Sequence, residues 1–318
     1  MEEWEKDLRE KAKSYSIPLK EEDYNLRQAI LLKVDISEAN LQGADLRKIS
    51  IPAANFSGKD LNQINLFQAA LLGANLRHTN LQDANLEGID LKGAYLKGRN
   101  LSTSDLSSAN LSNSILKKAD LTKAILQEAN LKNADLTEAI LKKVDFTGAN
   151  LTNANFSGSE LNQADFSNTT LKGAKFQNAD LRGVNFSNVD LREIDLTGAN
   201  LRKIDFSGKD LRKINFSETD LRKTNLKDCD LREANFFKAD LRGAYFNDSN
   251  LEAAYLSSAF LQGAILDRTN LQKAVLRYVI NLTGEQLQSA LIDKATKVPA
   301  YIEVIWTSED SFQCKNRE

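Results

Sequence analysis

The chain repeats one apolar residue at every fifth position, and this period excludes most ordinary folds. From Leu26 to Leu276 the series runs without a slip through 51 centres, of which 39 are Leu, ten are Phe and two are Ile. The residue two places before a centre is mostly Ala, and the residue one place before is Asp or Asn in 36 cases. Because a helix repeats every 3.6 residues and a strand every two, neither explains a period of five. The repeat therefore predicts a solenoid built from pentapeptides.

The glycines mark where each pentapeptide turns. Fourteen of the 15 glycines lie two residues after a centre, as Gly43 and Gly148 do, and Asn113 and Asn133 occupy the same slot. Gly and Asn tolerate positive φ, which the third residue of a type II turn requires. Each pentapeptide is therefore predicted to be a short extended stretch followed by a turn.

The ten central phenylalanines indicate how many pentapeptides close one coil. When the pentapeptides are dealt into four columns from Leu26, every central Phe falls in the first or third column. The first column holds Phe146, Phe166, Phe186, Phe206 and Phe246, and the third holds Phe56, Phe156, Phe176, Phe216 and Phe236. Rings on two opposing walls, with Leu on the others, suit a square cross-section filled by stacked layers. The pattern itself shows only an alternating ten-residue period, so four sides per coil is an inference.

Repeats such as Ala39-Asn40-Leu41, Ala44-Asp45-Leu46 and Ala129-Asn130-Leu131 resemble the A(D/N)LXX motif of the pentapeptide-repeat family. The resemblance covers residues 24–278. It implies an all-β solenoid, a right-handed quadrilateral parallel β-helix with four pentapeptides per coil and therefore about 13 coils. In such a fold each repeat contacts only its neighbours, so both ends need a cover.

Residues 1–23 are predicted to cover the N-terminal end. Trp4, Leu8 and Ala12 recur at the spacing of one helix face. A helical cap laid over the outward apolar residues of the first coils, such as Ile30 and Leu72, would bury both apolar surfaces.

Residues 279–318 are interpreted as a C-terminal helical cap and tail. The five-residue register fails at Asn281, and Thr283 with Gln286 then forms a capping-box motif, which predicts a helix start. Beyond about Thr307 the segment has the character of a tail.

The sequence is poor in residues for catalysis, cofactor binding or metal binding. It has one histidine, His78, and two cysteines, Cys229 and Cys314, which make no ligand cluster, nucleophile–base pair or disulfide framework. Cys229 occupies an Ala slot and is predicted to be a small core residue. We therefore expect no enzyme, no cofactor and no metal. The N-terminus has no apolar run, so we expect a cytoplasmic protein without a membrane segment.

Three cations stand in the otherwise small Ala slot, each directly after a Gly: Lys59, Arg99 and Lys209. A buried, unpaired cation costs several kcal/mol. Each is therefore expected to reach solvent through a local change in the turn. The alternative is that they bind an anion or a partner carboxylate.

Charge is distributed unevenly over the faces of the predicted coils. The candidate interaction residues are an acidic set and two arginine sets on opposite faces. The acidic set is Glu87, Asp105, Glu128, Asp145, Asp165 and Asp205; the arginine sets are Arg182, Arg202, Arg222 and Arg242, and Arg192, Arg212 and Arg232. Aspartates interleave with the arginines, at positions 180, 220 and 240 and at 190, 210 and 230. Two interpretations remain open, a self-neutralising surface ladder and an interaction stripe for an acidic partner.

Two classes of function compete. The first is a non-enzymatic, rigid protein–protein interaction scaffold with polarised charged faces and an unidentified protein partner. The second follows from the resemblance, because some family members mimic duplex DNA, bind type II topoisomerases and confer quinolone resistance. Duplex DNA carries about one charge per 1.7 Å, whereas the acidic face has about one carboxylate per 5 Å, so mimicry ranks second. Direct nucleic-acid binding is not expected.

Apolar residues replace polar ones in outward slots near the C-terminal end of the repeats. The candidate contacts are Phe237, Tyr245, Tyr255 and Phe260. Grouped surface aromatics indicate that something covers them. The cover is either the protein's own C-terminal segment or a second copy, and we expect a homodimer through the C-terminal end.

Overall fold

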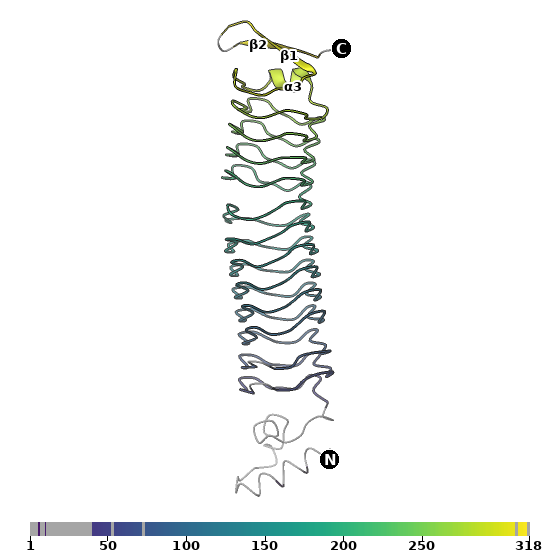
Figure 1. Ribbon diagram of the computed structural model, residues 1–318. Helices are drawn as coiled ribbons and strands as arrows, with labels where there is room; N and C mark the ends of the chain where they lie inside the picture. Colours follow the sequence, from purple (N-terminus) through teal and green to yellow (C-terminus); the bar gives the residue numbers. More distant parts are fainter. Residues whose placement is uncertain are drawn as a thin grey trace. The chain divides into compact units, whose positions relative to one another are not determined.

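The computed structural model describes residues 40–51, 54–71, 74–308 and 311–316, together with Lys6 and Glu10. They belong to two compact units, Met1–Leu151 and Thr152–Glu318. Within each unit the chain winds into coils that stack one upon another (Figure 1). The predicted N-terminal cap, with Trp4, Leu8 and Ala12, lies outside the described residues, as do Ile30 and Leu72.

Each coil consists of four pentapeptides. Parallel bridges join residues 20 apart in sequence, from Asp45 with Asn65 to Asn130 with Asn150 in the first unit. In the second unit they run from Asn155 with Lys175 to Phe260 with Ile280. The inference of four sides per coil is therefore confirmed in both units. The expected total number of coils includes repeats before residue 40, which lie outside the described residues.

Each side of a coil is shorter than an ordinary β-strand. One residue, immediately before the centre, bridges to the next coil, and a turn follows at once. Within the described ranges, the only strands longer than a single bridge are the two of the C-terminal cap. The expected β-helix is therefore held by isolated bridges, because the turn in every pentapeptide leaves no length for a continuous strand.

The turn slot behaves as predicted. Two residues after a centre φ is positive, for example 67° at Gly43 and 59° at Asn113. The turn closes when the third residue after a centre donates its amide to the carbonyl of that centre, as Ala44 does to Leu41 at 3.1 Å. The Asp or Asn before the centre accepts from the amide two residues later, as Asp210 does from Arg212 at 3.2 Å. This Asx contact explains why Asp and Asn dominate that position.

The interior of each coil is filled by the centres and the Ala slot. In the second unit Phe156 stacks on Phe176 with centroids 4.9 Å apart, and it meets Phe166 edge to face across the interior at 5.8 Å. The predicted arrangement of rings on opposing walls is therefore confirmed. Cys229 is 2% exposed, and burial raises the pKa of its thiol to about 11, so it is the small core residue that its slot predicts.

Between residues 184 and 214 of the second unit the Ala slot is overfilled. Six of its seven positions carry large side chains: Val184, Val189, Ile194, Ile204, Lys209 and Ile214. Close-packed interiors have little spare volume, so extra methylene groups displace backbone. We call the resulting gap, between residues 183–196 and residues 202–215 of the next coil, the crowded seam.

Two observations define the crowded seam. Among the described residues the Phe186 and Leu191 amides have no acceptor in the next coil, whereas Phe206, one coil further on, donates to Asn225 at 2.8 Å. The ring centroids of Phe186 and Phe206 are also 6.2 Å apart, compared with 5.5 Å for Phe166 and Phe186. Successive coils are therefore less tightly joined here than they are one coil further on.

The C-terminal cap begins with helix α3, Gly284–Gln288. The predicted capping box is present: the Thr283 hydroxyl accepts from the Gln286 amide, and the Gln286 side chain accepts from the Thr283 amide. After α3 the chain continues the ladder, because Leu291 bridges to Asn270 and Lys297 bridges to Val275. Leu287 and Ile292 are buried and cover the core of the last coil.

An antiparallel hairpin completes the cap. Strand β1, Ile302–Trp306, pairs with strand β2, Phe312–Asn316, and Figure 1 shows the hairpin beyond α3. The expectation of a tail beyond about Thr307 is wrong for residues 312–316, because they pair with β1 and Phe312 packs on Trp306 at 5.4 Å. The cap is therefore one short helix followed by a hairpin rather than a helical domain.

Candidate functional site

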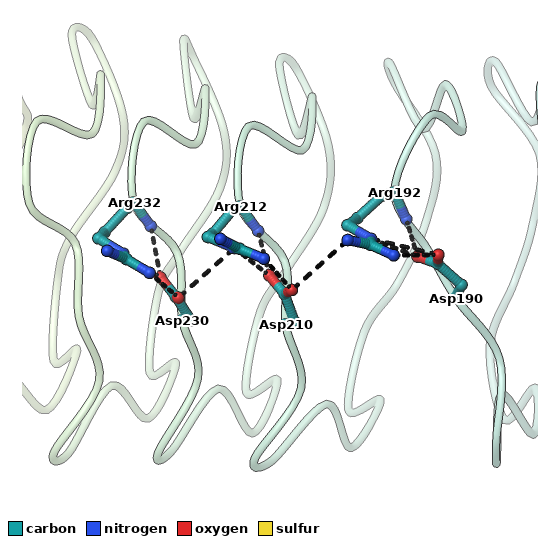
Figure 2. A network of polar contacts seen from close by, with 6 residues as sticks. All are labelled: Asp190, Arg192, Asp210, Arg212, Asp230 and Arg232. Carbon is teal, nitrogen blue, oxygen red and sulfur yellow. Dashed lines mark hydrogen bonds and ion pairs between the residues drawn. The ribbon is translucent and has the colours of Figure 1, made fainter.

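One of the two arginine sets is the closed ladder, which alternates Asp190, Arg192, Asp210, Arg212, Asp230 and Arg232 (Figure 2). Each arginine binds the aspartate two residues before it; Arg212, for example, donates Nε and Nη2 to Asp210 at 2.8 and 2.7 Å. It also reaches the carboxylate of the next coil, Asp230, at 3.6 Å. The closed ladder therefore neutralises itself along the stack.

The repeat dictates this geometry. The aspartate precedes a buried centre and the arginine follows it, so both side chains project from the same side of the coil. One carboxylate oxygen of Asp210 accepts the Arg212 amide as well as Nε, which fixes the second oxygen toward Nη2. The carboxylate is thus oriented by the turn before it meets the guanidinium.

The pKa values of the closed ladder reflect this pairing. The hydrogen bond from Arg212 is the main reason why the pKa of Asp210 falls to about 2. The pKa values of Asp190 and Asp230 are also lowered, chiefly by Arg192 and Arg232. All three carboxylates therefore stay ionised at neutral pH.

A groove of about 530 Å³ runs along the closed ladder, lined by Arg192, Glu193, Arg212, Lys213, Arg232 and Glu233. Its remaining charges are also paired, since Lys213 lies 3.6 Å from Glu233 and Lys172 lies 3.7 Å from Glu193. The groove therefore presents alternating, compensated charge and has no excess charge for a ligand.

The other arginine set is the open ladder, formed by Asp180, Arg182, Asn200, Arg202, Asp220, Arg222, Asp240 and Arg242. Most of it repeats the closed geometry: Arg222 lies 2.5 Å from Asp220 and 3.4 Å from Asp240 in the next coil. At position 200 the aspartate is replaced by Asn. Across the described part of the chain, the Arg202 guanidinium has neither an ion pair nor a hydrogen bond. We call each pair of residues 180 and 182, 200 and 202, and so on, a rung of its ladder. The closed and open ladders therefore differ in one rung, the one formed by Asn200 and Arg202.

The acidic residues are distributed over both units, and the four aspartates accept hydrogen bonds from neighbouring side chains. In the first unit Glu87 and Glu128 are exposed and Asp105 and Asp145 half-buried; Asp145 accepts from Gln127 at 2.7 Å. Burial raises the pKa of Asp145, but hydrogen bonds from Thr147 and Gln127 outweigh it and lower the pKa overall.

In the second unit the acidic positions alternate with amides. Asn185 donates to Asp165 at 3.1 Å, and Asn225 donates to Asp205 at 3.0 Å. Each of these two carboxylates thus accepts a hydrogen bond from a neutral side chain of the next coil. The aspartates of the acidic set are therefore hydrogen-bonded within the protein to an extent that the sequence alone does not show.

The aromatic residues near the C-terminal cap remain partly uncovered. Tyr245, Tyr255 and Phe260 are 42%, 43% and 37% exposed, and half-buried Phe237 stacks on Tyr255 with centroids 6.1 Å apart. The cap covers the end of the last coil and leaves these side chains accessible.

The cations in the Ala slot bond to backbone. Arg99 and Lys209 are half-buried; Arg99 Nε donates to the Lys97 carbonyl and Lys209 Nζ to the Phe186 carbonyl, both at 3.0 Å. Both side chains therefore reach solvent in part, as expected, and each also donates to a backbone carbonyl. Lys59 is half-buried as well.

Other polar chemistry is sparse in the described ranges. His78 is exposed, and no three His, Cys, Asp or Glu residues there lie close enough to hold a metal ion. In the same ranges no helix combines the length and the apolar character needed to cross a bilayer.

The repeat is matched by two family profiles. The pentapeptide repeat region profile matches residues 99–176, 119–196, 139–216 and 179–256. The profile of pentapeptide repeats in eight copies matches residues 25–58, 53–83, 60–98 and 249–284. The chain therefore belongs to the pentapeptide-repeat family, whose fold is the right-handed quadrilateral β-helix.

Three solved structures are similar to parts of the chain. HetL, a pentapeptide repeat protein involved in heterocyst differentiation regulation from the cyanobacterium Nostoc sp., is 27% identical; the match covers 86% of this chain and 94% of HetL, with a TM-score of 0.23. A pentapeptide repeat protein from the Arabidopsis thaliana thylakoid lumen is 32% identical over 33% of this chain and 66% of its own, with a TM-score of 0.17. QnrB1, a plasmid-mediated fluoroquinolone resistance protein, is 14% identical over 81% and 95%, with a TM-score of 0.19.

TM-scores this far below 0.5 leave the family assignment to the repeat profiles. No curated protein sequence matches the chain.

Proposed function

We propose that the protein is a non-enzymatic scaffold that binds another protein through the charged sides of its coils. The observation that carries this proposal is the pair of arginine ladders. Apart from Arg202, their side chains are held at the coil-to-coil repeat by hydrogen bonds to the backbone and to one another, as between Arg212 and Asp210. A surface whose side chains are ordered beforehand loses less conformational entropy on binding. This favours recognition of a partner rather than catalysis.

DNA mimicry with binding to a type II topoisomerase is the alternative. A mimic needs a dense array of free anions, because duplex DNA carries about one charge per 1.7 Å. Here Asp165 and Asp205 are each engaged by an Asn, and Asp145 by Gln127. DNA mimicry predicts that the protein protects DNA gyrase from a fluoroquinolone in a supercoiling assay, which the scaffold proposal does not. We expect no protection at micromolar protein.

A second copy of the chain is the other partner that we propose. Exposed Tyr245, Tyr255 and Phe260 lie on three different sides of the coils near the C-terminal cap, and exposed aromatics grouped at one end of a molecule usually mark an interface. Sedimentation equilibrium at tens of micromolar protein should give twice the 35.4 kDa chain mass. Phe237→Asp with Tyr255→Asp should yield a folded monomer, and a wild type that already sediments as a monomer rules the dimer out.

Affinity capture from native lysate tests the scaffold proposal. The bait is the full chain, compared with one variant in which the open-ladder arginines are Gln and another in which the acidic set is Asn or Gln. We expect a stoichiometric protein whose capture is lost with one neutralised face and kept with the other. Equal capture by all three baits contradicts recognition through a charged face.

A further inference from the structure

We propose that Arg202, Lys203 and Lys223, which we call the basic patch, bind an acidic segment of a partner protein. This inference rests on the proposed function, and it specifies the surface and the chemistry of the partner. Three observations support it: the missing carboxylate at position 200, the two unpaired lysines, and the remaining aspartates of the open ladder.

The first observation is the substitution of Asn for Asp in one rung. Asn200 accepts the Arg202 amide at 3.3 Å, so the turn is the same as in the other rungs. It brings no negative charge, however, and the half-buried Arg202 guanidinium is left without the bidentate partner that Arg222 has in Asp220. A planar fork of unused N–H donors fits a carboxylate supplied from outside.

The second observation is the pair of lysines beside it. Lys203 and Lys223 occupy the same turn slot in successive coils, and both are exposed. Neither is in an ion pair within the described ranges. The equivalent slot of the closed ladder alternates Glu193, Lys213 and Glu233, with Lys213 and Glu233 paired at 3.6 Å. Two like charges about one coil step of ~4.8 Å apart repel, and an added anion relieves that repulsion.

The third observation separates an acidic protein segment from a nucleic acid. The open ladder with its two lysines has six cations and three anions, a net charge of +3. The anions Asp180, Asp220 and Asp240 are interleaved with the cations along the stack. A continuous phosphate backbone, with about one charge per 1.7 Å in a duplex, would place phosphates against these carboxylates. Separate Glu or Asp side chains on a peptide avoid them and reach the basic patch alone.

The test measures the binding of a fluorescein-labelled octaglutamate peptide to the full chain by fluorescence anisotropy at low salt. A 20-base-pair duplex carries the same label as the competing probe. The patch variant is Arg202→Gln with Lys203→Gln and Lys223→Gln. The matched control, Arg192→Gln with Lys213→Gln and Arg232→Gln, removes the same charge from the closed ladder. All six side chains lie on the surface of the coils, so both variants should keep the fold.

We expect the patch variant to bind the peptide about tenfold more weakly, and the control to lie within about threefold of the wild type. Equal loss in the two variants overturns the proposal, because it shows that only net charge matters. Tighter binding of the duplex than of the peptide also overturns it, as does no peptide binding at all. Loss of a captured lysate partner in the open-ladder variant, without peptide binding, contradicts the basic patch but leaves the scaffold proposal standing.

Discussion

The ammonium of Lys209 donates a hydrogen bond to the carbonyl oxygen of Phe186, one coil back, at 3.0 Å. Thr224 and Cys229, 23 residues after Leu201 and Phe206, make the same contact from the same slot with small side chains, and the ladder there is intact. The longer lysine stem occupies space between coils. Within the described residues, the Phe186 and Asn188 amides then lack their acceptors.

Arg99 in the first unit also stands beside backbone amides that lack their acceptors. The amides of Leu76 and His78 lack the acceptors that the ladder predicts, the carbonyls of Tyr95 and Lys97, in the part of the chain that the structure describes. Arg99 Nε itself donates to the Lys97 carbonyl at 3.0 Å. Arg99 and Lys209, both cations in the Ala slot, therefore each accompany a looser join with the preceding coil.

Lys209→Ala should tighten the crowded seam. Restored backbone hydrogen bonds, worth about 1 kcal/mol each, should raise the free energy of unfolding by about 1 kcal/mol or more. Ile194, Ile204 and Ile214 remain, so the gain should be partial. Hydrogen–deuterium exchange followed by mass spectrometry should show slower exchange in peptides covering residues 183–196. Lys213→Ala, which removes an exposed lysine of the same coil, is the control and should leave that exchange unchanged.

Arg99→Ala should protect the amides of Leu76 and His78. The reason is that the Lys97 carbonyl is freed for the His78 amide once the guanidinium is removed. Exchange of a peptide spanning residues 74–80 reports this directly. Unchanged exchange in the variant would show that the join is loosened by something other than the Arg99 side chain.

Substituting Ala for different stacked phenylalanines of the second unit should lower the free energy of unfolding by different amounts. Phe176 lies in a tight stack with Phe156 at 4.9 Å, so Phe176→Ala should lower the free energy of unfolding by about 3–5 kcal/mol. Phe186 lies 6.2 Å from Phe206 beside the crowded seam, where the chain has room to relax. Phe186→Ala should therefore cost less than Phe176→Ala in urea unfolding. A larger cost at Phe186 contradicts the loose packing that we assign there.

Acid should weaken the closed ladder. Asp210 has a folded pKa of about 2 against an ordinary value of 3.8, so the unfolded chain binds its proton first as the pH falls. The stabilisation is complete above about pH 4 and is lost as the pH approaches 2. The urea midpoint of the wild type should fall more steeply between pH 5 and pH 2 than that of Arg212→Gln. The difference should be small and should shrink in high salt, because the pair is exposed; identical slopes contradict the assignment.

Much of the fold follows from the period of five and from the positions of Phe, Gly and Asn within it. Central Phe in alternate columns anticipates rings such as Phe156 and Phe166 meeting across the interior, and Gly or Asn after each centre anticipates positive φ. The bridge register of 20 residues needed the structure, because the sequence pattern repeats every ten.

Other features depend on packing that the repeat does not encode. Strand β2 pairs with β1, and its Phe312 packs on Trp306, but no repeat pattern marks that segment. The sequence shows that large residues occupy the Ala slot between Val184 and Ile214. Whether they separate the coils depends on how neighbouring layers share the interior volume, which the sequence does not show. The unpaired state of Arg202 has a visible signal, the Asn200 that interrupts Asp180, Asp220 and Asp240, yet the distances that make the other rungs bidentate come only from the structure.

Asn200→Asp tests the central claim, that the missing carboxylate makes Arg202 available to a partner. The substitution changes one amide to a carboxylate of the same shape and should recreate the pairing seen between Arg222 and Asp220. Anisotropy with the labelled octaglutamate peptide should show about fivefold weaker binding than the wild type, with an unfolding midpoint that is unchanged or higher. Unchanged peptide affinity in a folded Asn200→Asp variant would contradict the account.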